Sequence, residues 1–362
     1  MIYLDYQATT PLAPEALAAM LPWLESQHAN PHSAHVEGRK AKAAVEVARD
    51  QVAALLPPGG RIRFTSGATE ALNWAIKGST GPIVTLATEH AAVLDTVAAV
   101  GQAGREVRVL PVEADGRVDL TLAGEAIRSG TGLVAAMLVN NEIGVVQPVA
   151  ELAELAYDQG ALFLCDAVQG YGRVAIPGNC DLIAISAHKI HGPKGIGALW
   201  VRDGLSLMPL LHGGGQEAGG RSGTLSPALC AGFGAAAQLA HERGDADHAH
   251  VERLFALAVA RMADWTLNGS AEHRYRGNLN LRRAGLDVAR LMSDLRDIAF
   301  SAGSACASGS GRPSHVLGAI GLSDGEARSS IRLGFGRYTS EENLLIALDR
   351  IDAAARAQRV AA

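Results

Sequence analysis

The sequence predicts an α/β fold: a mainly parallel sheet covered by helices on both faces, followed by a smaller α+β region. Short continuous apolar runs alternate with segments of helical periodicity, which is typical of strands buried on both faces of a parallel sheet. From about residue 251 this alternation gives way to shorter elements and irregular segments. The length of 362 residues, at roughly 150 residues per domain, indicates two or three domains.

The first region contains the predicted strands of the main sheet, interrupted by helices. Two predicted helices end near residues 76 and 100, and a third covers 152–159. The strands are the apolar runs 62–64, 83–86, 107–110, 133–139, 161–165, 182–185 and 196–201.

The second region predicts a smaller α+β domain. A helix over 251–262 precedes an irregular stretch, and a Gly-, Ser- and Ala-rich loop over 301–313 has little apolar bulk to anchor it, so we expect it to be mobile. The other expected elements are a helix near 289–295, a strand over 331–335 and a helix over 340–357. We divide the chain into a large domain, 14–245, and a small domain, 1–13 with 246–362. The polar stretch at this boundary, 241–247, fits a linker or the middle of a helix.

Composition excludes several classes of protein. Hydrophobic residues make up 48% and charged residues 19%, as in a globular protein, and the net charge of −5 argues against a nucleic-acid binder. No uncharged apolar stretch reaches 18 residues and the first residues show no secretory pattern, so we expect a soluble, cytoplasmic protein without membrane contact. The four cysteines form no C-x-x-C pair, which argues against a disulfide framework and a zinc site.

Three groups that carry chemistry follow predicted strands, where ligands bind in open α/β sheets. Gly67-Ala68-Thr69 opens a helix and can cradle an anion, although such a turn is more often a simple cap. Asp166, by itself a plausible N-cap, and Lys189, by itself a plausible surface lysine, end neighbouring strands. Together they match the needs of pyridoxal phosphate: a lysine for the Schiff base and a carboxylate that keeps the ring nitrogen protonated.

Three further residues have two interpretations each. His90 opens a helix and is either a packed residue or a flat ring that stacks on a cofactor. Cys306 lies on the expected mobile loop and is either accidental or a reactive thiol, whereas the other three cysteines are interpreted as packing residues. Arg332 is either a solvated strand residue or a clamp for a substrate carboxylate.

These residues belong to motifs that together resemble the cysteine desulfurases of the NifS/IscS type, in the class V aminotransferase family. The motifs follow in the same order over nearly the whole chain: 3–11 (YLDYQATTP), 65–70 (TSGATE), 88–90 (TEH), 139–144 (VNNEIG), 166–169 (DAVQ), 188–195 (HKIHGPKG), 221–224 (RSGT), 303–306 (GSAC) and 330–332 (SIR). The resemblance implies a fold type I pyridoxal-phosphate enzyme with a seven-stranded sheet. The sequence departs from some relatives at Gln216, where they have histidine.

The resemblance also implies a role for each matching residue. Lys189 would form the Schiff base, Asp166 would pair with the ring nitrogen, Gln169 would donate to the ring hydroxyl, and His90 would stack on the ring and serve as a proton carrier. The implied phosphate ligands are Ala68, Thr69, Ser186, His188 and, from the other subunit of a homodimer, Thr224. Asn141 and Arg332 would hold the substrate carboxylate, and Cys306 would take the sulfur as a persulfide.

The implied reaction converts L-cysteine to L-alanine and passes the sulfur to a protein acceptor, an iron–sulfur scaffold or a sulfur carrier for cofactor or tRNA thiolation. Two alternatives stay open on sequence. One is another enzyme of the same fold, a selenocysteine lyase or an aminotransferase. The other is a non-enzymatic partner in cluster assembly, against which the intact set of Lys189, Asp166 and Cys306 argues.

Overall fold

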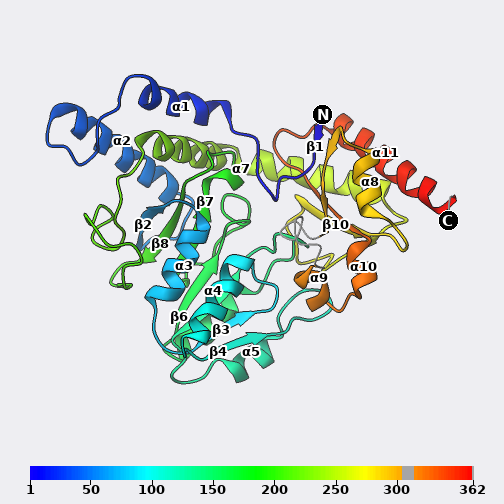
Figure 1. Ribbon diagram of the computed structural model, residues 1–362, viewed down its shortest axis with the longest axis horizontal. Helices are drawn as coiled ribbons and strands as arrows, with labels where there is room; N and C mark the ends of the chain where they lie inside the picture. The colour runs from blue at the N-terminus through cyan, green and yellow to red at the C-terminus, as the bar shows by residue number, and fades with distance from the viewer. Residues whose placement is uncertain (304–313, 361–362) are drawn as a thin grey trace.

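The computed structural model describes residues 1–303 and 314–360, and a seven-stranded sheet dominates its first half (Figure 1). The order across the sheet is β2-β8-β7-β6-β5-β3-β4. The pairs among β7, β6, β5, β3 and β4 are parallel, and β8 is antiparallel to both neighbours. The strands are β2 (Gly60–Thr65), β3 (Ile83–Leu86), β4 (Val107–Leu110), β5 (Leu133–Met137), β6 (Leu162–Asp166), β7 (Leu182–Ser186) and β8 (Gly197–Arg202). The predicted mainly parallel α/β architecture is confirmed.

Helices bury both faces of this sheet, which explains why its strands are apolar throughout. Successive residues of β5 alternate between two apolar clusters, with Val134 packed in one and Leu133 in the other. The helices of this half are α1 (Pro14–Glu25), α2 (Val36–Ala53), α3 (Ala68–Gly78), α4 (Ala91–Gln102), α5 (Leu120–Ala126) and α6 (Val149–Asp158). Cys165, Cys180 and Cys230 are buried free thiols, as predicted for packing residues.

The second half of the molecule is formed by the end of the chain together with its first residues. It contains a four-stranded sheet in the order β12-β13-β10-β9 and a pair formed by β1 and β11. Its apolar cluster joins Leu4 to residues from 254 to 355, so the first residues of the chain pack with the last. Figure 1 shows the two termini in this half. Its elements are β1 (Ile2–Tyr3), β9 (Thr266–Leu267), β10 (Asn278–Arg282), β11 (Ile298–Ala299), β12 (Ser301–Ala302), β13 (Ser330–Gly334), α8 (Val288–Asp294), α9 (His315–Ala319), α10 (Asp324–Arg328) and α11 (Glu341–Val360).

One long helix, α7 (Pro227–Arg261), joins the halves. The sequence predicted only its last part, from residue 251, and residue 245 lies inside it. Its first part is rich in small residues because α1 and α2 pack closely there. A Cβ at Gly232 would lie 2.6 Å from the Met20 side chain, and one at Gly234 would lie 2.8 Å from the backbone of Ala48. Within the part of the chain that the structure describes, no helix is long and apolar enough to cross a membrane.

Candidate active site

The carboxyl ends of β5, β6 and β7 open into a pocket of about 610 Å³, where the sequence placed its candidate residues. Every predicted site residue of the described chain except Thr224 lines it. They are Ala68, Thr69, His90, Asn141, Asp166, Gln169, Ser186, His188, Lys189 and Arg332. Segments that lie far apart in the sequence therefore meet in one cavity.

Lys189 enters the pocket from a single 3-10 turn, η1 (Ala187–Lys189), directly after β7. Its Nζ donates to the backbone oxygens of Gln7 and Ala8, at 2.9 Å for Ala8. The N-terminal segment is in turn fixed to the turn, since the Thr10 backbone N–H and hydroxyl both donate to the His188 carbonyl, at 3.0 and 2.9 Å. Main-chain oxygens of the N-terminal segment thus hold the amine in the pocket.

Asp166, the last residue of β6, is a buried carboxylate in the pocket wall. Its exposed fraction is 4%, and its Oδ1 accepts from the Val168 backbone N–H at 3.0 Å. Burial raises the pKa of Asp166, whereas that N–H, His90 and Lys189 oppose the rise. A cationic ring nitrogen at this position would therefore be a favourable partner for Asp166.

His90 is the N-cap of α4, and its Nδ1 accepts from the Ala92 backbone N–H at 3.0 Å. Because Nδ1 is an acceptor, the neutral ring carries its hydrogen on Nε2. Burial lowers the pKa of His90, and Asp166 partly offsets this. A neutral histidine with one defined tautomer can stack on an aromatic ring, and its Nε2 carries a hydrogen-bond donor.

The predicted phosphate ligands gather at the start of α3 and the end of β7. Among the described residues no side chain caps α3 at Gly67, so its first backbone N–H groups are available to an anion. A Cβ at Gly67 would meet nothing within 4 Å, so this corner is open. Ser186 and His188 approach from β7 and η1. Burial, together with the charges of Lys189 and Lys194, lowers the pKa of His188 to about 4, which leaves a neutral ring there.

Asn141 and Arg332 lie next to each other in the pocket, but Arg332 already has protein partners. Its Nη1 donates to the Asn141 backbone oxygen at 3.0 Å, and its Nη2 contacts Asp5 Oδ1 at 2.8 Å and Ser301 Oγ at 3.3 Å. Only 1% of the Arg332 side chain is exposed, which excludes a solvated strand residue. Asp5 holds the guanidinium in place at the edge of the cavity.

Sequence reasoning missed one part of the site and a buried acid next to it. Gln7, Ala8 and Thr9 line the pocket, and the contribution of Gln7 and Ala8 is made largely through carbonyl oxygens, which leave no trace in residue type. Glu89, which precedes His90, is completely buried, and its Oε1 accepts from the Met137 backbone N–H at 2.8 Å. Burial and nearby Asp166 raise the pKa of Glu89 well above its usual range. The sequence signal that could have indicated Glu89 is an acidic residue shortly after a predicted strand.

Two predicted residues are not in this pocket. Thr224 is exposed on a segment tied to α3 by the Arg221–Glu70 ion pair, at 2.8 Å, and does not line the pocket of its own chain. Cys306 and the rest of 304–313 lie outside the described residues.

The pocket fits the cofactor that the sequence resemblance implies. It combines an amine on a short turn, a buried carboxylate behind it, a helix start open to an anion and a neutral imidazole. Pyridoxal phosphate needs these four groups: an attachment point, a partner for its ring nitrogen, a phosphate cradle and a flat neighbour.

Comparisons with known proteins show which family the chain belongs to. The family model of the class V aminotransferases matches residues 2–346. A cysteine desulfurase IscS of Rickettsia bellii is 44% identical over 361 residues, covering 95% of this chain and 88% of the relative. A solved NifS-like protein superimposes with a TM-score of 0.90 at 31% identity, covering 98% of each chain. The solved structure of SspA in complex with cysteine has a TM-score of 0.83 at 36% identity, covering 94% of this chain and all of SspA.

Proposed function

The chain belongs to the class V aminotransferase family, with the fold of the type I pyridoxal-phosphate enzymes, and we propose from this that its pocket performs cysteine desulfuration. Members of the family with this activity use pyridoxal phosphate. The observation that carries the proposal for this chain is the meeting of Lys189, Asp166 and the open start of α3 in one cavity. L-Cysteine is the substrate, and L-alanine and a persulfide are the products.

The proposed roles are those that the family resemblance implies, and the positions of the residues in one pocket support them. Bound pyridoxal phosphate would supply an electron sink for the α-carbon of the substrate. Lys189 would attach the cofactor and, once released, move the α-proton, while Asp166 keeps the ring nitrogen charged. Ala68, Thr69, Ser186 and His188 would hold the phosphate, and Gln169 the ring hydroxyl.

The substrate would be held by its carboxylate. Arg332 and Asn141 lie together at the cavity edge, and the Asp5 contact pre-orients the guanidinium, which reduces the entropy lost on binding. The Cys306 thiolate would attack the substrate sulfur, so that one C–S bond breaks and one S–S bond forms. The α-carbon skeleton keeps the electron pair and, after protonation, leaves as alanine.

Further parts of the proposal concern assembly. We propose a homodimer in which Thr224 reaches the phosphate of the partner subunit, supported by its exposure outside its own pocket.

The division into 14–245 and 1–13 with 246–362 is supported by the separate apolar clusters, with α7 shared between the domains. A protein sulfur acceptor and a cytoplasmic location complete the proposal, and the free thiols of the three described cysteines fit a reducing compartment.

The test is to incubate the chain with pyridoxal phosphate and L-cysteine and to measure alanine and protein-bound persulfide. Cys306→Ser should bind the cofactor but form no persulfide and release alanine only at background rate. Cys230→Ser, at a buried thiol that does not line the pocket, is the matched control and should still form persulfide. Normal alanine release by Cys306→Ser would contradict the role of Cys306, and transamination of an oxo acid without persulfide would favour an aminotransferase.

A further inference from the structure

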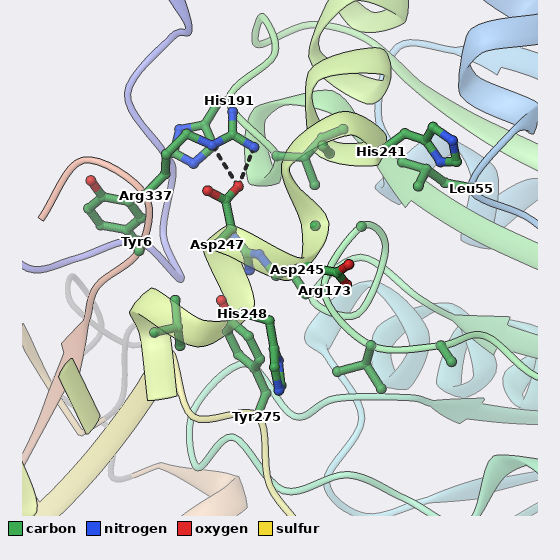
Figure 2. Close-up of a pocket in the computed structure, with 18 of the residues that line it drawn as sticks. Tyr6, Leu55, Arg173, His191, His241, Asp245, Asp247, His248, Tyr275 and Arg337 are labelled. Carbon is green, nitrogen blue, oxygen red and sulfur yellow. Dashed lines mark hydrogen bonds and ion pairs between the residues drawn. The ribbon is translucent and has the colours of Figure 1, made fainter. Parts of the chain in front are cut away.

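Arg173 lies behind the candidate active site, in the wall of a second pocket. This pocket, of about 360 Å³, is formed by α7, the segment after β6 and residues of the second half of the chain. Figure 2 shows Arg173 among its lining side chains together with Tyr275 and the ion pair between Arg337 and Asp247. The Arg173 guanidinium lies 5.3 Å from the centre of the Tyr275 ring, a favourable cation–π arrangement.

The donors of Arg173 point away from this second pocket, toward two residues of the first. Nη1 donates to Gln169 Oε1 at 3.1 Å, and Nη2 donates to the backbone oxygen of Lys189. Gln169 is buried, with 4% of its surface exposed. One guanidinium therefore holds the side chain of one predicted cofactor ligand and the main chain of another.

The contact with Gln169 fixes which way its amide points. A guanidinium only donates hydrogen bonds, so the amide atom that it meets must be the oxygen. The NH₂ group of Gln169 then faces the other way, and one of its hydrogens reaches the Gln7 backbone oxygen at 3.0 Å. The second hydrogen is available to an acceptor in the cavity. The Gln7 carbonyl favours the same orientation, and Arg173 adds a charged donor that holds the amide oxygen. Without Arg173 the orientation rests on the Gln7 contact alone.

We propose that Arg173 is a positioning residue that sets the amide of Gln169 as a donor toward the cofactor and anchors the main chain that carries Lys189. This inference rests on the proposed function, since it requires pyridoxal phosphate in the pocket. It adds a residue that does not line the cavity and to which the sequence analysis gave no role.

The experiment measures the affinity of the cofactor-free chain for pyridoxal phosphate and the visible circular dichroism of the bound cofactor. Arg173→Met removes the donors but keeps most of the aliphatic volume. We expect it to weaken binding by about 10- to 100-fold, the usual effect of losing charge-assisted hydrogen bonds in a buried site. The circular dichroism should fall as well, because the ring is held less firmly.

Arg337→Met is the matched control, since it removes an arginine from the wall of the same pocket without touching the candidate active site. Cofactor affinity should change less than about twofold, even if the chain becomes less stable. Equal effects of the two substitutions on cofactor affinity and circular dichroism would overturn the proposal. Should Arg173→Met fail to fold, Arg173→Lys keeps the charge but cannot make two parallel contacts, and must still weaken binding.

A double substitution separates positioning from general destabilisation. If Arg173 acts on the cofactor through Gln169, then Arg173→Met should cost clearly less affinity in a Gln169→Ala background than in the native chain. A loss of the same size in both backgrounds would refute the coupling. If the native chain itself binds no pyridoxal phosphate, the proposed function fails, and that outcome is distinct from failure of the role of Arg173.

Discussion

The pocket at the strand ends and the pocket beside α7 contain similar charged side chains, but satisfy them differently. In the pocket beside α7, Arg337 and Asp247 pair with each other at 2.6 Å, and that pair joins α7 to the segment after β13. In the pocket at the strand ends, Asp166 accepts from the Val168 backbone and Lys189 donates to backbone carbonyls. Arg332 of the same pocket forms an ion pair with Asp5 at 2.8 Å, and that pair orients a group proposed to bind the substrate carboxylate. The charges of the first pocket thus surround the proposed ligands, whereas the Arg337–Asp247 pair forms a junction between α7 and the segment after β13.

The largest expected effect comes from Lys189→Ala. The variant should fold, because the lysine is only partly buried, but it should lose the cofactor absorbance at about 400 nm. Alanine release should fall by about 1000-fold or more, since attachment and proton transfer both depend on this amine. Absorbance spectra and alanine assays check this. An unchanged band would mean that another lysine attaches the cofactor, and Lys194→Ala, on the same pocket wall, is the control.

A smaller effect tests whether a neutral acid, Glu89, is buried next to the pocket at the strand ends. Met137, whose N–H binds Glu89, is the neighbour of Asp166 across β5 and β6, so Glu89 is held beside the end of β5 and Asp166 ends the adjacent strand. Because burial raises the pKa of Glu89 in the folded chain, the folded state retains a proton that the unfolded state releases. The stability from this group is complete below about pH 4.5 and is lost as the pH rises toward the folded pKa.

Glu89→Gln should remove the part of the pH dependence of stability that comes from Glu89. As the pH increases from 5 to 8, the free energy of unfolding of the variant should rise relative to that of the native chain, measured by urea unfolding of the cofactor-free chain. Glu125→Gln, at an exposed position of α5, should follow the native chain throughout. If the native and Glu89→Gln curves stay parallel, Glu89 does not carry a proton in the folded state.

The same contrast explains how much of the molecule the sequence could predict. Asp166 and Lys189 were found because a polar residue at the end of an apolar strand conflicts with its surroundings unless it has a function. Gln7 and Ala8 were missed because part of their contribution is a carbonyl group, which every residue has. Arg173 was given no role because its partners are fixed only when the loop after β6 folds back against η1.

The helices and strands were also only partly predictable from the sequence. The strands of the main sheet follow from apolar runs, which burial on both faces requires. The first part of α7 was missed because its small residues, such as Gly232 and Gly234, have low helix propensity, and only the approach of α1 and α2 shows why they are there. In this part of α7, tertiary packing outweighs the low helix propensity of the glycines.

The smallest expected effect on function comes from the junction itself. Asp247→Asn leaves the Arg337 guanidinium, 6% exposed, without its charged partner. Asp247 is itself 22% exposed and also faces Arg243 at 3.4 Å, so we expect destabilisation of about 1–2 kcal/mol, not the larger cost of breaking a fully buried pair. Urea unfolding measures this loss, and adding Arg337→Met should recover part of it because no charge is then buried alone. Cofactor affinity should stay within about twofold of the native value in both variants. A larger change would mean that the junction controls the geometry of the pocket at the strand ends, and that the two pockets form one functional unit.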